Sequence, residues 1–176
     1  MNMAGKTYRD LLSEKAFLRV KERADKLGGV NLVSIDFNDF ELRFRMRSAD
    51  KPNVYYTELV RFSDLSADTV IKSGGSLGQV LRNVGIKVYC SCPAFEYWYA
   101  YKAYRGGYGI YPEGRYPKIR NPRLQGYICK HLYAVLRIYP FWSQRIAKEF
   151  RLHYTDKQQK EIANAIEDAL RRMVVV

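Results

Sequence analysis

All three cysteines and one of the two histidines fall into two short pairs of potential metal ligands that lie far apart in the chain. Cys90 and Cys92 are one residue apart in YCSCPAF, and Cys129 and His131 have the same spacing in YICKHLY. Thiolate sulfur and imidazole nitrogen are the usual ligands of structural zinc, and four of them complete a tetrahedral shell. The pattern therefore predicts one Cys3His site for Zn2+, with no position left for water or a substrate.

Other uses of these residues fit the sequence less well. Three thiols cannot all pair within one chain, and two cysteines separated by one residue rarely close a disulfide. A nucleophilic Cys129 with His131 as its base would require both residues to be free of metal. The remaining alternative is that they are ordinary buried residues, since cysteine and histidine are common in protein interiors. We expect a structural site in a protein that is not an enzyme and takes no small-molecule substrate.

The predicted elements around each pair can aim both of its members at one point. Residues 86–92, IKVYCSC, are typical of a strand, which points residues i and i+2 to the same face. Cys129 and His131 can converge only if they straddle a helix start, and a helix is predicted over 129–139, with its stop at Pro140. The unpaired N–H groups at a helix start also favour a thiolate there.

The pattern Cys90-Ser91-Cys92 followed by Cys129-Lys130-His131 resembles the SWIM zinc-binding motif. The resemblance implies a zinc-pinned ββα-like unit that binds DNA or proteins and does not catalyse a reaction. The chain is also similar to small SWIM-containing proteins of tailed bacteriophages in its combination of CSCPAF, IRNP and CKHL. That similarity implies a place in a virion or in the handling of viral DNA. The insert between the two halves of the motif, residues 93–128, is longer than the family normally shows.

The rest of the chain predicts a mixed α+β fold. Thr7 and Asp10 resemble a capping box, which would begin a helix over 8–27. Alternating apolar and polar residues then predict a small antiparallel meander with a hairpin turn at Asn38-Asp39. The expected strands are 30–37, 40–47 and 54–62, and the expected further helices are two short ones within 64–84, one at 94–104 and one at 155–173 with Ile162 and Ile166 on its apolar face.

We expect one compact domain with three regions. Residues 1–85 would form a helix and the antiparallel sheet, residues 86–142 the SWIM-type zinc unit, and residues 143–176 a C-terminal helical segment packed outside. The N-terminus lacks the apolar core of a signal peptide, and no apolar run is long enough to span a bilayer. These features predict a protein of the reducing cytoplasm with no membrane partner.

The net charge of +12 is concentrated around the insert. Residues 90–150 carry ten Lys and Arg against three acidic residues, and they hold ten of the fifteen tyrosines. Basic and aromatic side chains together suit phosphates and unpaired bases, but tyrosine and arginine are also enriched at protein interfaces, and some rings can simply cover the zinc core. The candidate contact residues are Tyr104, Arg105, Tyr108, Tyr111, Arg115, Tyr116, Lys118, Arg120 and Arg123.

Two functions follow from these expectations. The first is a structural component of a larger assembly, with a bacteriophage virion as the assembly that the resemblance implies and with other proteins as its partners. The alternative is a free DNA- or RNA-binding accessory protein that uses the basic insert. A row of Arg43, Arg45 and Arg47 on one strand face is a further candidate for phosphate contacts, although the pattern favours an ordinary solvated strand face.

Overall fold

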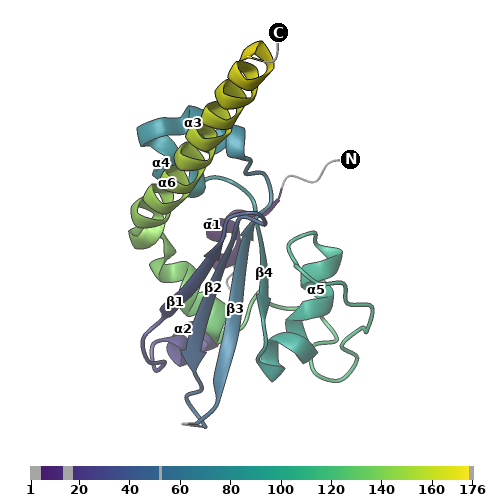
Figure 1. The fold of residues 1–176 in the computed structure, drawn as a ribbon. Coiled ribbons are helices and arrows are strands. Elements are labelled where there is room, and N and C mark those ends of the chain that lie inside the picture. Colours follow the sequence, from purple (N-terminus) through teal and green to yellow (C-terminus); the bar gives the residue numbers. More distant parts are fainter. Residues whose placement is uncertain (1–4, 14–17, 52, 175–176) are drawn as a thin grey trace.

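The computed structural model describes residues 5–13, 18–51 and 53–174. The fold is mixed α+β, as the sequence predicts, with one small antiparallel sheet, short N-terminal helices and a long C-terminal helix (Figure 1). In chain order the elements are α1 (Tyr8–Leu12), α2 (Leu18–Ala24), β1 (Asn31–Asp36), β2 (Glu41–Arg47), β3 (Tyr55–Phe62), α3 (Ala67–Ser73), the 3-10 turn η2 (Gly74–Ser76), α4 (Leu77–Leu81), β4 (Ile86–Cys90), the π-helical turn η3 (Phe95–Tyr99), α5 (Ala100–Arg105) and α6 (Lys130–Val174).

The four strands form a meander in the order β1-β2-β3-β4, with every neighbour antiparallel. Strand β4, which ends at Cys90, therefore extends the same sheet that the N-terminal meander begins. Figure 1 shows α6 beginning behind the sheet and extending past its upper end, while α5 and the insert lie beside β4. The free edge of β4 is covered there, because Val88 pairs in parallel with Gly109.

One face of the sheet carries the core. Cross-strand pairing of Glu58 with Cys90 and of Val60 with Val88 sets Cys90, the first predicted metal ligand, directly beside the apolar rows of β3 and β4. A single buried cluster then runs from Tyr8 to Tyr154 and includes the three cysteines. Removal of this apolar surface from water is the main source of stability for such a layered fold.

The N-terminal region differs from the expected single helix over 8–27. The capping box is confirmed, since the Thr7 N–H donates to Asp10 Oδ2 (2.8 Å) and the Asp10 N–H donates to Thr7 Oγ1 (3.3 Å). Helix α1 nevertheless ends at Leu12, with Ser13 as its C-cap, and α2 is a separate helix. Residues 14–17 of the expected helix lie outside the described residues.

The expected helix stop at Pro140 is wrong, because α6 continues through it. Proline removes one backbone donor and strains the preceding turn, which normally ends or kinks a helix. Here α6 is held on both sides of the proline by buried side chains, among them Tyr139 and Ile146. The Pro140 carbonyl also accepts hydrogen bonds from Arg82 Nη2 (3.1 Å) and Ser143 Oγ (2.8 Å). Figure 1 shows α6 changing direction between its green and its yellow parts.

The last part of α6 is not packed as expected. Ile162 and Ile166, placed on a buried face by the sequence pattern, are 53% and 57% exposed. Figure 1 shows this stretch projecting beyond the sheet. In the described part of the chain, no helix is both long enough and apolar enough to cross a membrane.

Candidate metal centre

The four predicted ligands lie together, although they come from three different local structures. Cys90 is the last residue of β4, Cys92 follows it by two residues, and Cys129 and His131 flank the first residue of α6. Their ligand atoms all lie within 4.8 Å of one another, and all four residues are buried. The sequence pattern thus brings together one cluster that can hold a metal ion.

Cys92 is positioned by a helix start and not by the strand predicted for residues 86–92. Strand β4 ends at Cys90, and a helical run begins at Pro93, a residue favoured at the first position of a helix. The Cys92 carbonyl accepts from the N–H of Phe95 (3.0 Å), and the same N–H lies 3.3 Å from Cys92 Sγ. The N–H of Cys92 in turn donates to Cys90 Sγ (3.4 Å). Backbone donors therefore stabilise negative charge on both sulfurs.

Cys129 occupies the equivalent place before α6, as the sequence predicts. The Cys129 carbonyl accepts from the N–H of Tyr133 (2.9 Å), and the N–H of Leu132 donates to the Cys129 sulfur. Two helix starts, one after Cys92 and one after Cys129, therefore direct unpaired N–H groups at a single cluster. This arrangement favours thiolates over thiols at the site.

The distances fit a tetrahedral ion. Zn–S bonds of about 2.3 Å place the ligand atoms of a tetrahedron about 3.8 Å apart. Cys90 Sγ and His131 Nδ1 are 3.9 Å apart, and the largest separation in the cluster is 4.8 Å. Metal binding would therefore draw the donors together by about 1 Å at most. His131 Nε2 is also buried and has no hydrogen-bond partner, so an imidazole nitrogen is available for the metal.

The protonation pattern of the cluster also fits a metal. Burial raises the pKa of Cys90 and of Cys129, while hydrogen bonds from the other two thiols lower the pKa of Cys92. Cys92 is thus the most acidic of the three thiols, and Cys90 and Cys129 hold their protons more tightly. A divalent cation would replace those two protons, since bound cysteines are deprotonated.

Glu58 is a component of the site that the sequence pattern did not indicate. Its carboxyl is fully buried, and the Cys90 thiol donates to its Oε1 (3.6 Å). Burial raises the pKa of Glu58 to about 8, so the group is largely protonated at neutral pH. A carboxylic acid beside Cys90 can donate to the thiolate once a metal is bound, which is a common role for groups around metal ligands. Only the register of β3 against β4 places Glu58 there, 32 residues from Cys90 in sequence.

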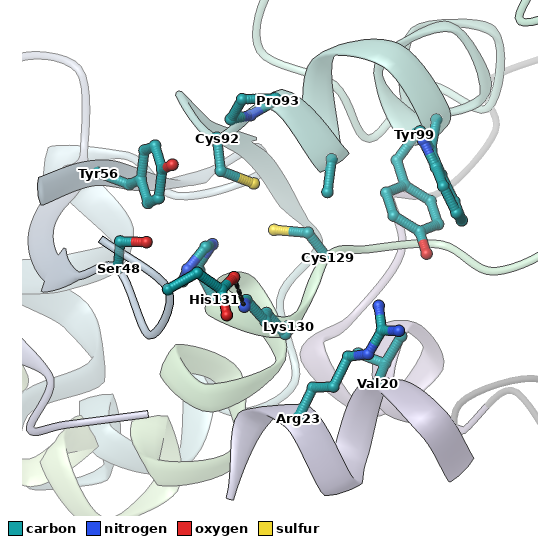
Figure 2. A pocket seen from close by; sticks show the side chains of 13 residues that line it. Val20, Arg23, Ser48, Tyr56, Cys92, Pro93, Tyr99, Cys129, Lys130 and His131 are labelled. Atoms are coloured by element: carbon teal, nitrogen blue, oxygen red, sulfur yellow. Dashed lines mark hydrogen bonds and ion pairs between the residues drawn. The ribbon is translucent and has the colours of Figure 1, made fainter. Parts of the chain in front are cut away.

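A cavity of about 280 Å³ opens on one side of the cluster (Figure 2). Cys92, Cys129 and His131 line its inner end, and Arg23 and Lys130 lie at its sides. Figure 2 shows Arg23 of α2 extending toward the Tyr99 ring on one side of this space. The cavity also gives metal ions and chelators a path to the site.

The structure divides the nine candidate contact residues of the insert. Tyr108 is wrong as a contact residue, because it is 1% exposed and packs in the core. Tyr111 stacks edge-on against Tyr89, and the Tyr116 hydroxyl donates to the Pro122 carbonyl. These two tyrosines have exposed surface but also serve to order the insert.

The basic candidates also differ in whether they have a partner within the insert. Arg115 is paired with Glu113 (2.7 Å) and lies 3.7 Å from Glu96. The other candidates are exposed at the surface: Tyr104, Arg105, Lys118, Arg120 and Arg123. Eight of the nine candidates are therefore exposed, and among them only Arg115 has an acidic partner that the structure shows.

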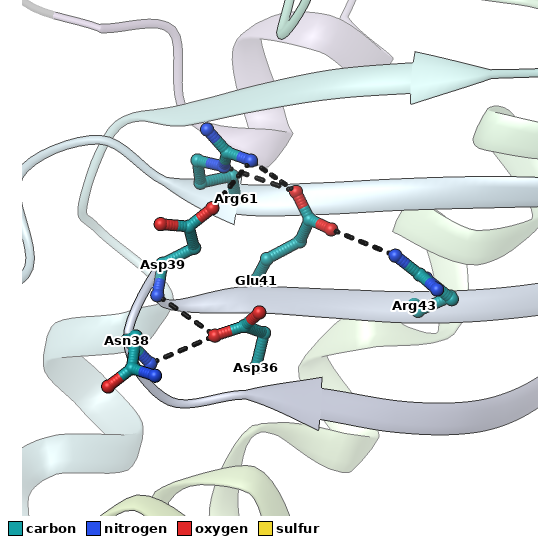
Figure 3. A network of polar contacts seen from close by, with 6 residues as sticks. All are labelled: Asp36, Asn38, Asp39, Glu41, Arg43 and Arg61. Carbon is teal, nitrogen blue, oxygen red and sulfur yellow. Dashed lines mark hydrogen bonds and ion pairs between the residues drawn. The ribbon is translucent and has the colours of Figure 1, made fainter.

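The strand row of arginines has internal partners. Arg61 of β3 bridges Asp39 (3.0 Å) and Glu41 (2.8 Å), and Arg43 lies 3.9 Å from Glu41 (Figure 3). The Arg45 guanidinium stacks over the Tyr55 ring at 4.6 Å. These contacts join the strands of the open sheet face, and they explain the row without a bound phosphate.

No protein-family model matches the chain, and neither a curated protein nor a solved structure matches it significantly. The likeness to SWIM proteins thus stays at the level of the four-ligand motif and its neighbouring residues.

Proposed function

We propose that the protein is a non-enzymatic binding module whose Cys3His cluster holds a structural zinc ion. The observation that carries the proposal is the convergence of four buried donors from two distant segments within 4.8 Å. Three thiolates and one imidazole are a donor set that selects zinc over magnesium or calcium, which require oxygen ligands. Four protein ligands leave no open coordination position, so the proposed ion is structural.

The proposed role of the ion is to close the insert. Cys92 immediately precedes residues 93–128, and Cys129 immediately follows them. A metal that binds both cysteines removes the closing entropy of a long loop, and this adds to the burial of the insert's own core residues, such as Phe95 and Tyr108. The closed insert then presents its exposed Tyr and Arg side chains to a partner.

We further propose that this partner belongs to a larger assembly. Exposed tyrosines and arginines on a fixed loop suit an interface, because they bury a large area at little loss of side-chain freedom. The similarity of CSCPAF, IRNP and CKHL to small phage proteins supports a bacteriophage particle as that assembly.

The metal is tested by elemental analysis and X-ray absorption on protein purified without chelators. We expect one zinc ion per chain, bound by three sulfurs and one nitrogen. Cobalt substitution should give the intense thiolate absorption of a four-coordinate site, unchanged by small anions that would replace a bound water. A chain purified free of metal, or an exchangeable oxygen ligand, would contradict a structural zinc site.

The assembly role is tested separately. Phage particles banded in a density gradient should contain the chain in a fixed ratio to other particle proteins when measured by mass spectrometry. Its absence from such particles would contradict the virion role and leave the zinc module intact.

A further inference from the structure

A basic groove runs from the metal centre between α2 and the end of the insert. It consists of two adjoining cavities of about 280 and 350 Å³ that share Val20, Arg23, Trp98 and Tyr99. We define the arginine groove by the five side chains that dominate its outer part, namely Arg19, Arg23, Trp98, Arg120 and Arg123. The first two come from a helix nearly one hundred residues before the last two, so only the fold brings them together.

The groove has a large unbalanced positive charge. Arg19 and Arg23 are one helical turn apart and lie on the same side of α2. Arg120 and Arg123 face them from the insert. Among the described residues, none of these four exposed arginines has an acidic partner. Such a concave row of guanidinium groups is suited to bind several phosphates.

The only acidic residue lining either cavity, within the described chain, stands at the other end. Asp50 lies beside the metal centre and is 3.4 Å from Lys130 Nζ, which offsets its charge. The outer cavity has no carboxylate in its lining. The charge of the groove is therefore positive along its whole outer length.

The insert side of the groove is held in place by a buried asparagine. Asn121 Nδ2 donates to the Trp98 carbonyl (2.9 Å) and to the Gln125 carbonyl (2.8 Å), and its Oδ1 accepts from the Gln125 N–H (2.8 Å). Nearby, Gly126 has φ +72°, and a Cβ there would lie 2.9 Å from the Tyr99 ring. These contacts fix the turn that carries Arg120 and Arg123 against the helix that carries Trp98.

We propose that the arginine groove binds single-stranded nucleic acid. The four arginines would contact successive phosphates, and the Trp98 ring, 38% exposed and present in both cavities, would stack on an unpaired base. The inference rests on the proposed function in one respect, because the zinc site joins both ends of the insert and so sets its distance from α2.

Two other ligands fit the groove less well. In a duplex the bases are stacked and paired inside the double helix, so they cannot stack on the Trp98 ring in the groove. An acidic peptide can also be bound by an arginine cluster, but its carboxylates supply no base to stack on the Trp98 ring. Separate phosphates on a flexible backbone match the spacing and chemistry of the arginines more closely.

The test is fluorescence anisotropy of labelled oligothymidylate and oligouridylate with the zinc-loaded protein over a range of salt concentrations. Four phosphate contacts predict a slope of about −3 for log K against log salt, since each contact to a single strand contributes about −0.7. In a Trp142→Phe background, stacking should also quench the emission of Trp98. The same oligonucleotides annealed to their complements should bind more weakly and without this quenching.

Variants separate the groove from general charge. Two double variants remove half of the arginines each: Arg19→Ala with Arg23→Ala, and Arg120→Ala with Arg123→Ala. Each should lower the affinity for the oligonucleotide by about tenfold or more and reduce the salt slope by about 1.4. Trp98→Ala should lower affinity by at least about fivefold without changing the slope, and Trp98→Tyr should restore most of the loss. The matched control is Arg43→Ala with Arg45→Ala, which removes the same charge from the open sheet face.

Zinc content and far-UV circular dichroism are measured for every variant, which keeps the two proposals distinguishable. Zinc-loaded, folded protein that fails to bind oligonucleotide would overturn the groove and leave the zinc module standing. Equal losses in the sheet control, or competition by polyglutamate as strong as by oligonucleotide, would also overturn it. Absence of zinc with binding retained would instead contradict the proposed function alone.

Discussion

The apolar core and the insert hold distant parts of the chain together in different ways. In the core, α6 packs against the sheet through many buried side chains, and Phe150 alone contacts Phe37, Phe40 and Phe62. In the insert, residues 106–129 form no helix or strand apart from the single bridge of Gly109. The two ends of the whole insert, residues 93–128, instead meet at the cysteine cluster. Stability that is spread over many contacts tolerates the loss of any one, whereas a metal site depends on each of four atoms.

The largest effect should follow from the loss of one metal ligand. Structural zinc sites contribute about 10–16 kcal/mol, which is comparable to the whole stability of a domain. Cys129→Ser should therefore lose both zinc and the folded insert, and circular dichroism with elemental analysis would show the two losses together. The control is Ser91→Ala, between the two strand cysteines, which should keep its zinc. An unchanged melting temperature of the Cys129→Ser protein would contradict the claim that the insert, unlike the core, depends on the metal site.

A core truncation should weaken the protein without affecting the metal. Phe150 is fully buried, so Phe150→Ala should lower the free energy of unfolding by about 3–5 kcal/mol through lost burial and a residual cavity. The folded fraction should still bind one zinc per chain. Phe141→Ala on the same helix is the matched control, because Phe141 is 84% exposed and should change stability little in chemical denaturation. Zinc loss from folded Phe150→Ala would show that the two regions are not independent.

Removal of the Asn121 side chain should loosen the insert alone. It leaves two carbonyls and one N–H without their buried partner, at a cost of about 1–3 kcal/mol. In the Asn121→Ala variant, the backbone amide hydrogens of residues 118–126 should therefore exchange with solvent faster. Zinc should be retained, and the protection of the sheet amides should be unchanged. Asn164→Ala, at an exposed position of α6, should exchange like the unmodified protein. Faster exchange throughout the sheet would contradict a local role for Asn121.

The smallest effect should come from the surface ion pair of the insert. The hydrogen bond from the Arg115 side chain lowers the pKa of Glu113 below its ordinary value of 4.5. A lowered pKa means that the stabilising contribution is complete above the ordinary value and is lost as the pH falls through the lowered one. An NMR titration of the Glu113 carboxyl should show this low midpoint, and Glu113→Gln should change thermal stability least of the four changes. The control is Glu96→Gln, because the Glu96 carboxyl is farther from Arg115 than the Glu113 carboxyl is. In this variant the titration midpoint of Glu113 should hardly move. A Glu113 midpoint at 4.5 in the unmodified protein would disprove the pairing in solution.

Much of the fold followed from local pattern, and the misses have physical causes. The alternation in FELRFRMR and the capping box at Thr7 are confirmed, because both depend on neighbouring residues only. The stretch between Pro140 and residue 155 was not assigned to a helix, although Ile146, Phe150 and Tyr154 have helical spacing and are buried. The proline was read as a stop because its local cost is real, but the packing on both sides of it outweighs that cost.

For the site, the sequence by itself determined the four potential ligands, since ligand type and close spacing are properties of short segments. It also determined the basic, tyrosine-rich character of the insert. Only the tertiary structure decided that Glu58 lies against Cys90, that Tyr108 is buried, and that α2 faces the end of the insert. These neighbours are set by strand register and helix packing between segments far apart in the chain, and no short-range pattern encodes which distant surfaces meet.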